Sequence, residues 1–216
     1  MTFVDDEIIQ LTWKEGIAYR YQMETFDIVA NYTYEGEGWG LAYDGNQLIM
    51  SNRTDVLTLR NATTFEIEGT LNVTLNGEPL DKINEMEIWG GMLLANIYQT
   101  EEIVGIDLNS GVVILRIDAS GLRPQGAGVM NGIAFDSSTQ SLWITGKEWP
   151  MMYNVTFIEP EAPSEPEHEV DQPSSTDDNF VYSNVILAIM LAAVVILLAM
   201  NLKDGGRNPP DEGALE

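Results

Sequence analysis

Six side chains of this sequence combine aromatic surface with polar groups at equivalent places of a repeated pattern, which makes them candidates for a binding or catalytic site. They are Trp13, Trp39, Asn84, Tyr98, Asn131 and Lys147. Aromatic walls with a few amide and ammonium groups suit chemistry in which a bound group is oriented and a developing negative charge is stabilised.

The repeated pattern consists of three similar strings that begin at Trp39, Asn84 and Asn131, spaced by roughly 45 residues. Each string is followed by a turn and then by two further short apolar runs. The second runs are 48–51, 92–97 and 142–145, and the third runs are 56–59, 103–107 and 152–155. This period predicts an all-β chain that folds as a β-propeller of about three and a half four-stranded blades. The blades must pack around a common axis, because one blade cannot bury its faces alone.

The predicted propeller places the six candidates on one face. The residues that begin the strings would start inner strands near the mouth of the central channel, and the other three would lie on loops at or just beyond the ends of second strands. Each residue also has a structural alternative. Trp39 could pack between blades, Asn84 could cap a turn, and Lys147 could be an ordinary surface residue.

The composition limits the possible partners. The chain has 216 residues, no cysteine, and 34 acidic against 10 basic side chains, which gives a formal net charge of −24. Neither a disulfide framework nor a thiolate metal site is possible without cysteine. The acidic balance argues against a nucleic-acid partner, because phosphate binding requires a basic surface. Solubility in a salty or extracellular setting is the simplest interpretation of the charge, and binding of a small cation is a more distant alternative.

The C-terminal part predicts a membrane anchor. Residues 181–202 carry no charge and are rich in Leu, Ile, Val and Ala, and their length is enough for one transmembrane helix. Lys203 and Arg207 follow this segment, whereas acidic residues precede it. The positive-inside rule therefore predicts a single-pass protein of the cell membrane, with residues 203–216 as a short cytoplasmic tail and the repeats outside.

Residues 159–180 separate the repeats from the predicted span. They are rich in Pro, Glu, Ser and Asp and lack apolar periodicity, which is typical of an extended linker. His168, the only histidine, falls in this linker, where nothing rigid would hold a catalytic or metal-binding side chain. The predicted domain boundaries are thus 1–158, 159–180, 181–202 and 203–216.

Five Asn-X-Thr sequons agree with an external domain, and they predict a glycoprotein if the host has the pathway. They begin at Asn31, Asn52, Asn61, Asn72 and Asn154. The alternative is that Thr is favoured in strands and Asn in turns. No signal peptide precedes the strand-like residues 7–12, so we expect either that the C-terminal span acts as the targeting signal or that the natural N-terminus lies upstream.

Four strings, in order, resemble the plant and bacterial type of glutaminyl-peptide cyclotransferase, also called glutamine cyclotransferase. They are QLTWKEG at 10–16, GEGWGLAYD at 36–44, NEME at 84–87 and TGKEWP at 145–150. The resemblance covers about residues 7–157. It implies a five-bladed propeller, incomplete in this chain, whose substrates are peptides with an N-terminal glutamine.

The reaction that the resemblance implies is cyclisation of that glutamine to pyroglutamate with release of ammonia, without a metal or another cofactor. By similarity to the family, Trp13 and Trp39 would enclose the glutaminyl group, Asn84 would orient it, and Lys147 would supply positive charge near the oxyanion. Tyr98 stands where the family more often has Trp. A role for Asn131 is inferred from its equivalent place in the repeat.

One departure from the family affects the catalytic prediction. The family's proton-shuttling glutamate precedes the Trp13 loop by about 14 residues, a count that runs beyond Met1. Glu37 does not replace it, because Trp39 fills the equivalent position of the repeat. We therefore expect a membrane-anchored cyclotransferase that is represented here by a fragment without its acid/base glutamate. The alternative is a catalytically inactive extracellular propeller that serves as a binding or surface module.

Overall fold

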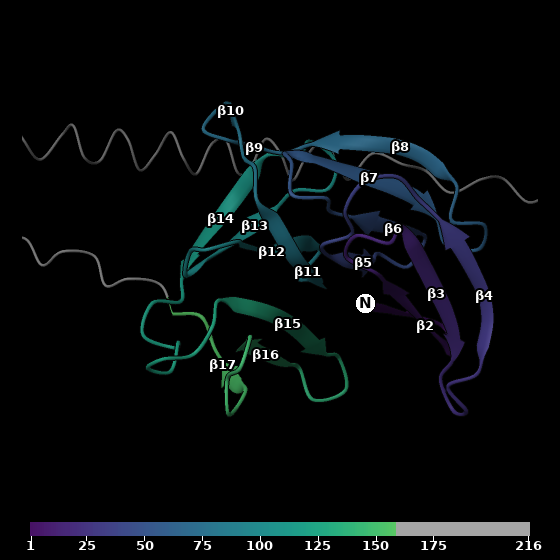
Figure 1. Cartoon of the computed structure of the whole chain (residues 1–216). Helices are drawn as coiled ribbons and strands as arrows, with labels where there is room; N and C mark the ends of the chain where they lie inside the picture. The colour runs from purple at the N-terminus through teal and green to yellow at the C-terminus, as the bar shows by residue number, and fades with distance from the viewer. Residues whose placement is uncertain (159–216) are drawn as a thin grey trace, which may run out of the picture. The chain divides into compact units, whose positions relative to one another are not determined.

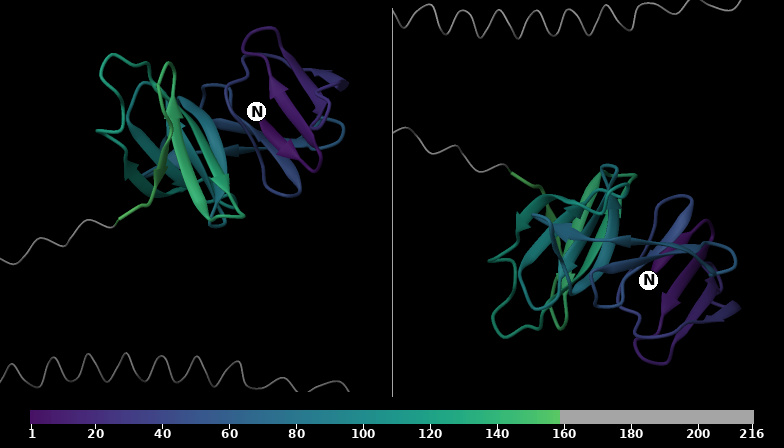
Figure 2. Two further views of the ribbon diagram at one scale, coloured as in Figure 1. Left: turned by 90° about the horizontal axis from the view of Figure 1, so that it is seen from below. Right: turned by 90° about the horizontal axis from the view of Figure 1, so that it is seen from above.

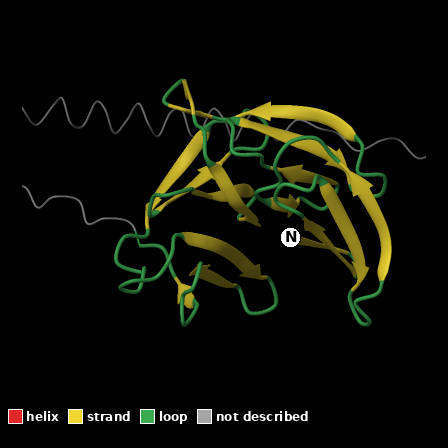
Figure 3. Cartoon of the chain, in the orientation of Figure 1, coloured by secondary structure: helices red, strands yellow, loops and turns green. Residues whose placement is uncertain are grey.

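The structure is a computed structural model that describes residues 1–158 (Figure 1). These residues form seventeen β-strands and no helix (Figure 3). Between residues 1 and 158 no helix is long and apolar enough to cross a membrane. The predicted linker, transmembrane helix and tail, residues 159–216, lie outside the described residues.

The strands form four antiparallel meanders that follow one another around the middle of Figure 1. The first blade contains β1 (Thr2–Val4), β2 (Glu7–Leu11), β3 (Ile17–Gln22) and β4 (Ile28–Thr33). The second contains β5 (Leu41–Tyr43), β6 (Gln47–Met50), β7 (Val56–Asn61) and β8 (Ile67–Asn72). The third contains β11 (Ile83–Trp89), β12 (Met92–Ile97), β13 (Glu102–Ile106) and β14 (Val113–Asp118). The fourth contains β15 (Met130–Asp136), β16 (Ser141–Gly146) and β17 (Tyr153–Val155).

The all-β propeller architecture predicted from the repeats is confirmed, although the count of blades differs slightly. The described part holds three four-stranded blades and one three-stranded blade, whereas about three and a half blades were expected. The sequence period began at Trp39 and marked only residues 7–12 before it, so the complete first blade was undercounted. A small hairpin of β9 (Thr74–Leu75) and β10 (Glu78–Pro79) between the second and third blades was also not predicted.

The first strands of successive blades stand next to one another. β1 contacts β5, β5 contacts β11, and β11 contacts β15. In the two views of Figure 2, the purple and blue strands of the first two blades lie on one side and the teal and green strands of the last two on the other. Loops at one end of these inner strands can therefore share a site.

Three apolar clusters hold the blades together, one between each pair of neighbours. The alternation of side chains along a strand explains how one strand serves two clusters. Leu93 of β12 packs toward the second blade and Leu94 toward the fourth. In β6, Leu48 packs toward the first blade and Ile49 toward the third. Both faces of an inner blade are thus buried, which is why its strands read as continuous apolar runs.

A β-bulge recurs in the first strands, and it decides where the candidate site residues point. In β11 the pairs Ile83↔Ile97 and Met86↔Ala95 leave two residues, Asn84 and Glu85, opposite the single residue Asn96. The pairing of β15 with β16 leaves Asn131 and Gly132 opposite Thr145 in the same way. A bulge re-aims a side chain that would otherwise follow the strand's alternation.

The second blade has the equivalent arrangement just before β5. The Trp39 N–H donates to the Ser51 carbonyl at 3.1 Å, and the Ser51 N–H donates to the Gly40 carbonyl at 3.0 Å. Trp39 and Gly40 therefore face Ser51, as Asn84 and Glu85 face Asn96. The sequence predicted an inner strand that begins at Trp39, but β5 begins at Leu41, because the bulge interrupts regular pairing at this point.

Candidate functional site

A cavity of about 230 Å³ is lined by residues from all four blades. Its lining consists of Trp13, Gly38, Trp39, Asn84, Tyr98, Asn131 and Lys147. The structure thus brings together all six side chains that were selected from the sequence. The six side chains come together because three of these residues lie at the bulges of first strands and the other three follow second strands.

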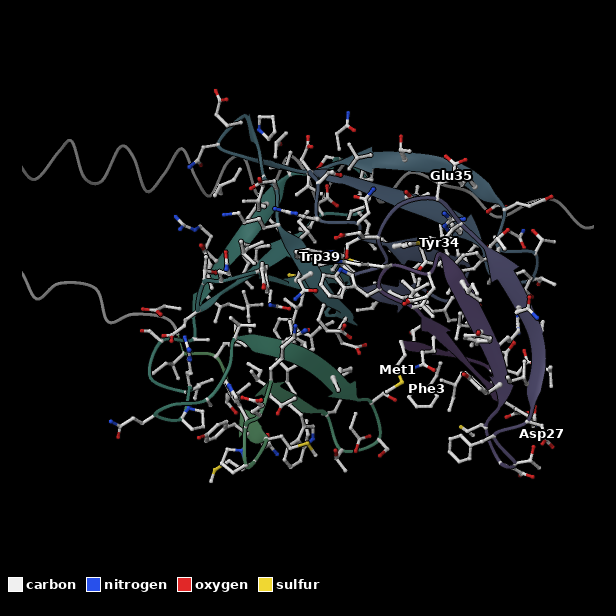
Figure 4. The ribbon with its side chains drawn as sticks, in the orientation of Figure 1. Met1, Phe3, Asp27, Tyr34, Glu35 and Trp39 are labelled. Carbon is white, nitrogen blue, oxygen red and sulfur yellow. The ribbon has the colours of Figure 1, made fainter. Side chains whose placement is uncertain are left out.

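Aromatic rings form much of the cavity wall. The rings of Trp39 and Tyr98 meet edge to face, with centroids 5.0 Å apart and an interplanar angle of 80°. Trp39 lies in the middle of Figure 4, between the blades. Trp13 keeps 58% of its surface exposed, so a ligand can cover a large apolar area there. A wall of this kind can hold the flat, uncharged end of a small side chain.

The amide of Asn84 is available to a ligand. Asn84 is only 5% exposed, yet within residues 1–158 its side chain has no hydrogen-bond partner. The nearby Asn96 is different, because its Oδ1 accepts from the Glu85 N–H at 3.0 Å and its Nδ2 donates to the Met130 carbonyl at 2.8 Å. The Asn84 amide is not among the fully buried side-chain atoms that lack a partner in residues 1–158, so it keeps contact with the open space of the cavity. The bulge therefore presents the Asn84 amide to the cavity, while Asn96 holds the strands.

Asn131 occupies the same bulge position one blade further on. Its half-buried side chain also forms no hydrogen bond with another described residue. Gly132 follows with φ near 150°, and a Cβ at this residue would press against Thr145. The two amides, Asn84 and Asn131, can together offer donors and acceptors to a carboxamide.

Lys147 supplies the positive charge of the cavity. It follows β16 directly, and its main chain is fixed by two hydrogen bonds of 2.9 Å, one to the Val129 carbonyl and one from the Gly128 N–H. Its Nζ lies 5.9 Å from the ring centroid of Tyr98. Among the residues that line the cavity, Lys147 alone carries a charge. An ammonium group here can stabilise an oxyanion that forms in the cavity.

Glu37, which does not occupy the position of the family's acid/base glutamate, is in direct contact with the aromatic wall. Its carboxylate accepts a hydrogen bond of 2.8 Å from the Trp39 Nε1–H. Hydrogen bonding, first to the Trp39 indole and then to the Trp13 indole, lowers the pKa of the Glu37 carboxyl. The GEGW string is the feature of the sequence that could have indicated this contact. In it, Glu37 lies between two glycines and two residues before Trp39.

Two further carboxylates lie on β11 and do not line the cavity. Desolvation raises the pKa of Glu85, and desolvation also raises the pKa of Glu87 to about 7. The described part of the chain has no group of three or more His, Cys, Asp or Glu residues arranged to hold a metal ion.

The family model for glutamine cyclotransferase matches residues 1–157. The chain belongs to this family. Membership confirms the resemblance that the four strings indicated, and it covers all four blades of the described structure. This glutamine cyclotransferase family member therefore shares more with its relatives than a generic propeller fold.

Two proteins that are similar to this family member carry names of the same activity. A glutaminyl-peptide cyclotransferase from Arabidopsis thaliana is 28% identical over 172 residues, which are 76% of this chain and 54% of the relative. The chain thus spans about half the length of that curated relative. The crystal structure of a glutaminyl cyclase from Myxococcus xanthus matches with a TM-score of 0.68 and 32% identity, covering 72% of this chain and 70% of that chain.

Proposed function

We propose that this chain binds the N-terminal glutamine of a peptide in the four-blade cavity and converts it to pyroglutamate with release of ammonia. The observation that supports this most strongly is the Asn84 amide, which has no partner among residues 1–158 and lines the cavity beside an aromatic wall and one lysine. A glutaminyl side chain matches this lining, because it offers a flat carboxamide with two donors and two lone pairs. The relatives' names point to the same substrate class.

In the proposed reaction the substrate's own α-amine is the nucleophile. Its nitrogen forms a bond to the side-chain carboxamide carbon, and the carbonyl oxygen becomes an oxyanion. A proton then moves from the α-nitrogen to the amide nitrogen, and the carbon–nitrogen bond breaks to give pyroglutamate and ammonia. The protein has to hold the chain in a near-attack geometry and stabilise the oxyanion.

The proposed roles follow from the position of each side chain. Trp13 and Trp39 would enclose the glutaminyl group, with Tyr98 against the edge of Trp39. The Asn84 amide would orient the carboxamide. Lys147 would lie near the developing oxyanion, where a positive charge is stronger once the ligand has displaced water. Asn131, at the equivalent bulge, would hold the other side of the substrate's polar end.

A second candidate function is recognition of an N-terminal glutamine without turnover. It is favoured by one observation, namely that no carboxylate lines the cavity among the described residues. Proton transfer to the leaving nitrogen is commonly assisted by a positioned acid, which contributes about 10²–10⁴-fold in rate. Without such a group the same cavity would serve as a binding site.

Incubation of the full chain with the dipeptide Gln-Gly, followed by an ammonia assay, tests the proposal. The matched variants are Asn84→Ala and Lys147→Met, and the Myxococcus xanthus glutaminyl cyclase is the positive control. We expect ammonia release by the wild-type chain and its loss in Asn84→Ala. Saturable quenching of tryptophan fluorescence by Gln-Gly without ammonia would favour the binding module, and neither signal would contradict both candidates.

We also propose that the protein is anchored in the cell membrane with the propeller outside, on the basis of the uncharged residues 181–202 and the following Lys203 and Arg207. The three exposed sequon residues, Asn31, Asn72 and Asn154, lie on β4, β8 and β17, the last strand of their blades. Glycans there would leave the cavity open. Protease accessibility of the propeller on intact cells tests the orientation, and a mobility shift after glycosidase treatment tests the modification.

A further inference from the structure

Glu37 is not among the residues that line the cavity, but its carboxylate contacts the aromatic wall. Its hydrogen bond to the Trp39 Nε1–H, at 2.8 Å, is the one side-chain contact that the Trp39 indole nitrogen makes among the described residues. The rings of Trp39 and Tyr98 meet at the cavity, so a change in the Trp39 ring would alter the shape of the site.

The main chain around Glu37 is fixed by its two neighbouring glycines. Gly36 has φ +83°, a left-handed conformation that favours glycine. A Cβ at Gly38 would collide with the Tyr34 hydroxyl and the Thr12 carbonyl, and the Gly38 N–H donates to the Trp13 carbonyl at 3.0 Å. This turn therefore ties the Glu37 main chain to the Trp13 loop and aims the carboxylate at the indoles.

The charge around Glu37 favours its ionised form. Hydrogen bonding to Trp39 is the largest cause of its lowered pKa, Trp13 adds to it, and the positive charges of Lys14 and Arg53 act in the same direction. Lys14 Nζ lies 4.0 Å from the Trp13 ring centroid, and the Arg53 guanidinium lies 5.9 Å from that of Trp39. A carboxylate held in this state is a weak base, so it suits a fixed acceptor better than a proton shuttle.

We infer that Glu37 is a positioning residue, which accepts the indole N–H of Trp39 and thereby sets the affinity of the cavity for the glutaminyl group without exchanging a proton with it. The inference rests on the proposed function for its ligand, but the contact between Glu37 and Trp39 can be tested without any substrate. An ionised acceptor makes a stronger hydrogen bond than a neutral one and so holds the ring more firmly.

The test compares Glu37→Gln and Glu37→Ala with Glu35→Gln, an exposed position in the same turn that does not contact Trp39 (Figure 4). The first readout is the indole ¹H–¹⁵N resonance of Trp39 in the full chain, assigned with Trp39→Phe. We expect this resonance to move with pH at a midpoint below that of an ordinary glutamate, and we expect Glu37→Gln to abolish the movement. Glu35→Gln should leave the titration as in the wild type.

The second readout is the dissociation constant for Gln-Gly, measured by tryptophan fluorescence. We expect about tenfold weaker binding in Glu37→Ala and a smaller loss, about threefold, in Glu37→Gln, whose amide oxygen can still accept. Where turnover is measurable, KM should rise in proportion while kcat stays within about twofold, because uniform binding is lost.

The outcomes separate the two proposals. A Trp39 resonance that titrates identically in Glu37→Gln and wild type overturns the positioning role, and so does unchanged affinity in Glu37→Ala. A kcat that falls with unchanged KM would instead make Glu37 a proton-transfer group. If the wild-type chain does not bind Gln-Gly at all, the proposed function fails, and the indole titration alone still decides whether Glu37 holds Trp39.

Discussion

The Ser51 hydroxyl donates a hydrogen bond of 2.9 Å to the main-chain carbonyl of Asn84, and it accepts one of 2.8 Å from the Gly40 N–H. One side chain thus joins the bulge of the second blade to the bulge of the third. Asn96 makes the corresponding connection from the third blade to the fourth. Ser51 and Asn96, which lie opposite the first two bulges, thus join neighbouring blades, and the first residue of each bulge lines the cavity.

This division of roles predicts opposite results for two asparagines. Asn96→Ala removes the acceptor of the half-buried Glu85 N–H and the donor to the buried Met130 carbonyl, so we expect a loss of about 2–4 kcal/mol in the free energy of unfolding. Asn84→Ala should change stability by less than about 1 kcal/mol, because its amide has no partner to lose. Urea unfolding followed by circular dichroism measures both. Equal destabilisation by the two variants would contradict the assignment of Asn84 to a ligand.

The close approach of the second and third blades predicts that Gly40 tolerates no side chain. A Cβ at this residue would collide with the Asn84 carbonyl oxygen, which is main chain and cannot rotate away. We expect Gly40→Ala to cost at least about 2 kcal/mol of stability and to weaken Gln-Gly binding with it. Gly69→Ala is the control, because its Cβ would meet only a Leu59 methyl group at 3.6 Å. A neutral Gly40→Ala variant would mean that the blades can separate without cost.

The position of Glu87 predicts a pH dependence of stability. Desolvation raises the pKa of its carboxyl from 4.5 to about 7 in the folded chain. Between these values the folded chain keeps a proton that the unfolded chain has released, so stability is lost as the pH rises through this range and is constant above it. Glu87→Gln should remove this loss. Between pH 4.5 and pH 8, the free energy of unfolding of wild type should therefore fall by roughly 1–2 kcal/mol more than that of the variant.

Thermal unfolding at pH 4.5, 6 and 8 measures this effect, with Glu35→Gln as the exposed control. If wild type and Glu87→Gln show the same change between pH 4.5 and 8, Glu87 is not the group responsible. The burial pattern of β11 would then have to be explained without a neutral carboxyl at Glu87.

The edge-to-face pair of Trp39 and Tyr98 predicts which substitutions the cavity wall accepts. Tyr98→Trp keeps an aromatic edge against Trp39 and should retain Gln-Gly binding within about threefold. Tyr98→Ala removes the ring and should weaken binding about tenfold, since an aromatic pair contributes roughly 0.5–1.5 kcal/mol beyond its buried area. Fluorescence titration measures both. Loss of binding in Tyr98→Trp with retained stability would mean that the tyrosine hydroxyl is required.

The charge of Lys147 predicts that its removal affects kcat more than KM. Lys147→Met should lower kcat by about 10²-fold or more, with a smaller change in KM, because the oxyanion exists only in the transition state. Lys147→Arg keeps the charge and should recover part of the rate. Steady-state ammonia release measures both parameters. An equal rise in KM with unchanged kcat would assign Lys147 to ground-state binding instead.

Much of the fold could be predicted because the repeat is also a packing unit. The second runs 48–51, 92–97 and 142–145 correspond to β6, β12 and β16 within one residue at each end, since an apolar run buried on both faces has clear limits. The first blade was harder to recognise, because its outer strands carry polar and aromatic residues such as Tyr19 and Tyr21 rather than an apolar run.

The side chains that line the candidate site could be predicted from the sequence, but the residues that hold them in place could not. Equivalent positions in a repeat lie close to the same axis, and this indicated Asn131, whereas the resemblance to the family indicated Trp39 and Asn84 at the same position of their repeats. The role of Glu37 depends on a hydrogen bond to a residue two positions away in a tight turn, and the desolvation of Glu87 depends on the neighbouring blade. Neither leaves a periodic signal in the sequence.

The bulge that recurs in three blades has a consequence for how such a protein can change over time. One backbone position carries an indole in the second blade and amides in the next two, at Trp39, Asn84 and Asn131. A ring of identical units would repeat one chemical group around its axis and would bind an unsymmetrical ligand equally well in several orientations. Different residues at this one position in each blade favour a single orientation of an unsymmetrical molecule, while the main chain that forms the bulge stays the same.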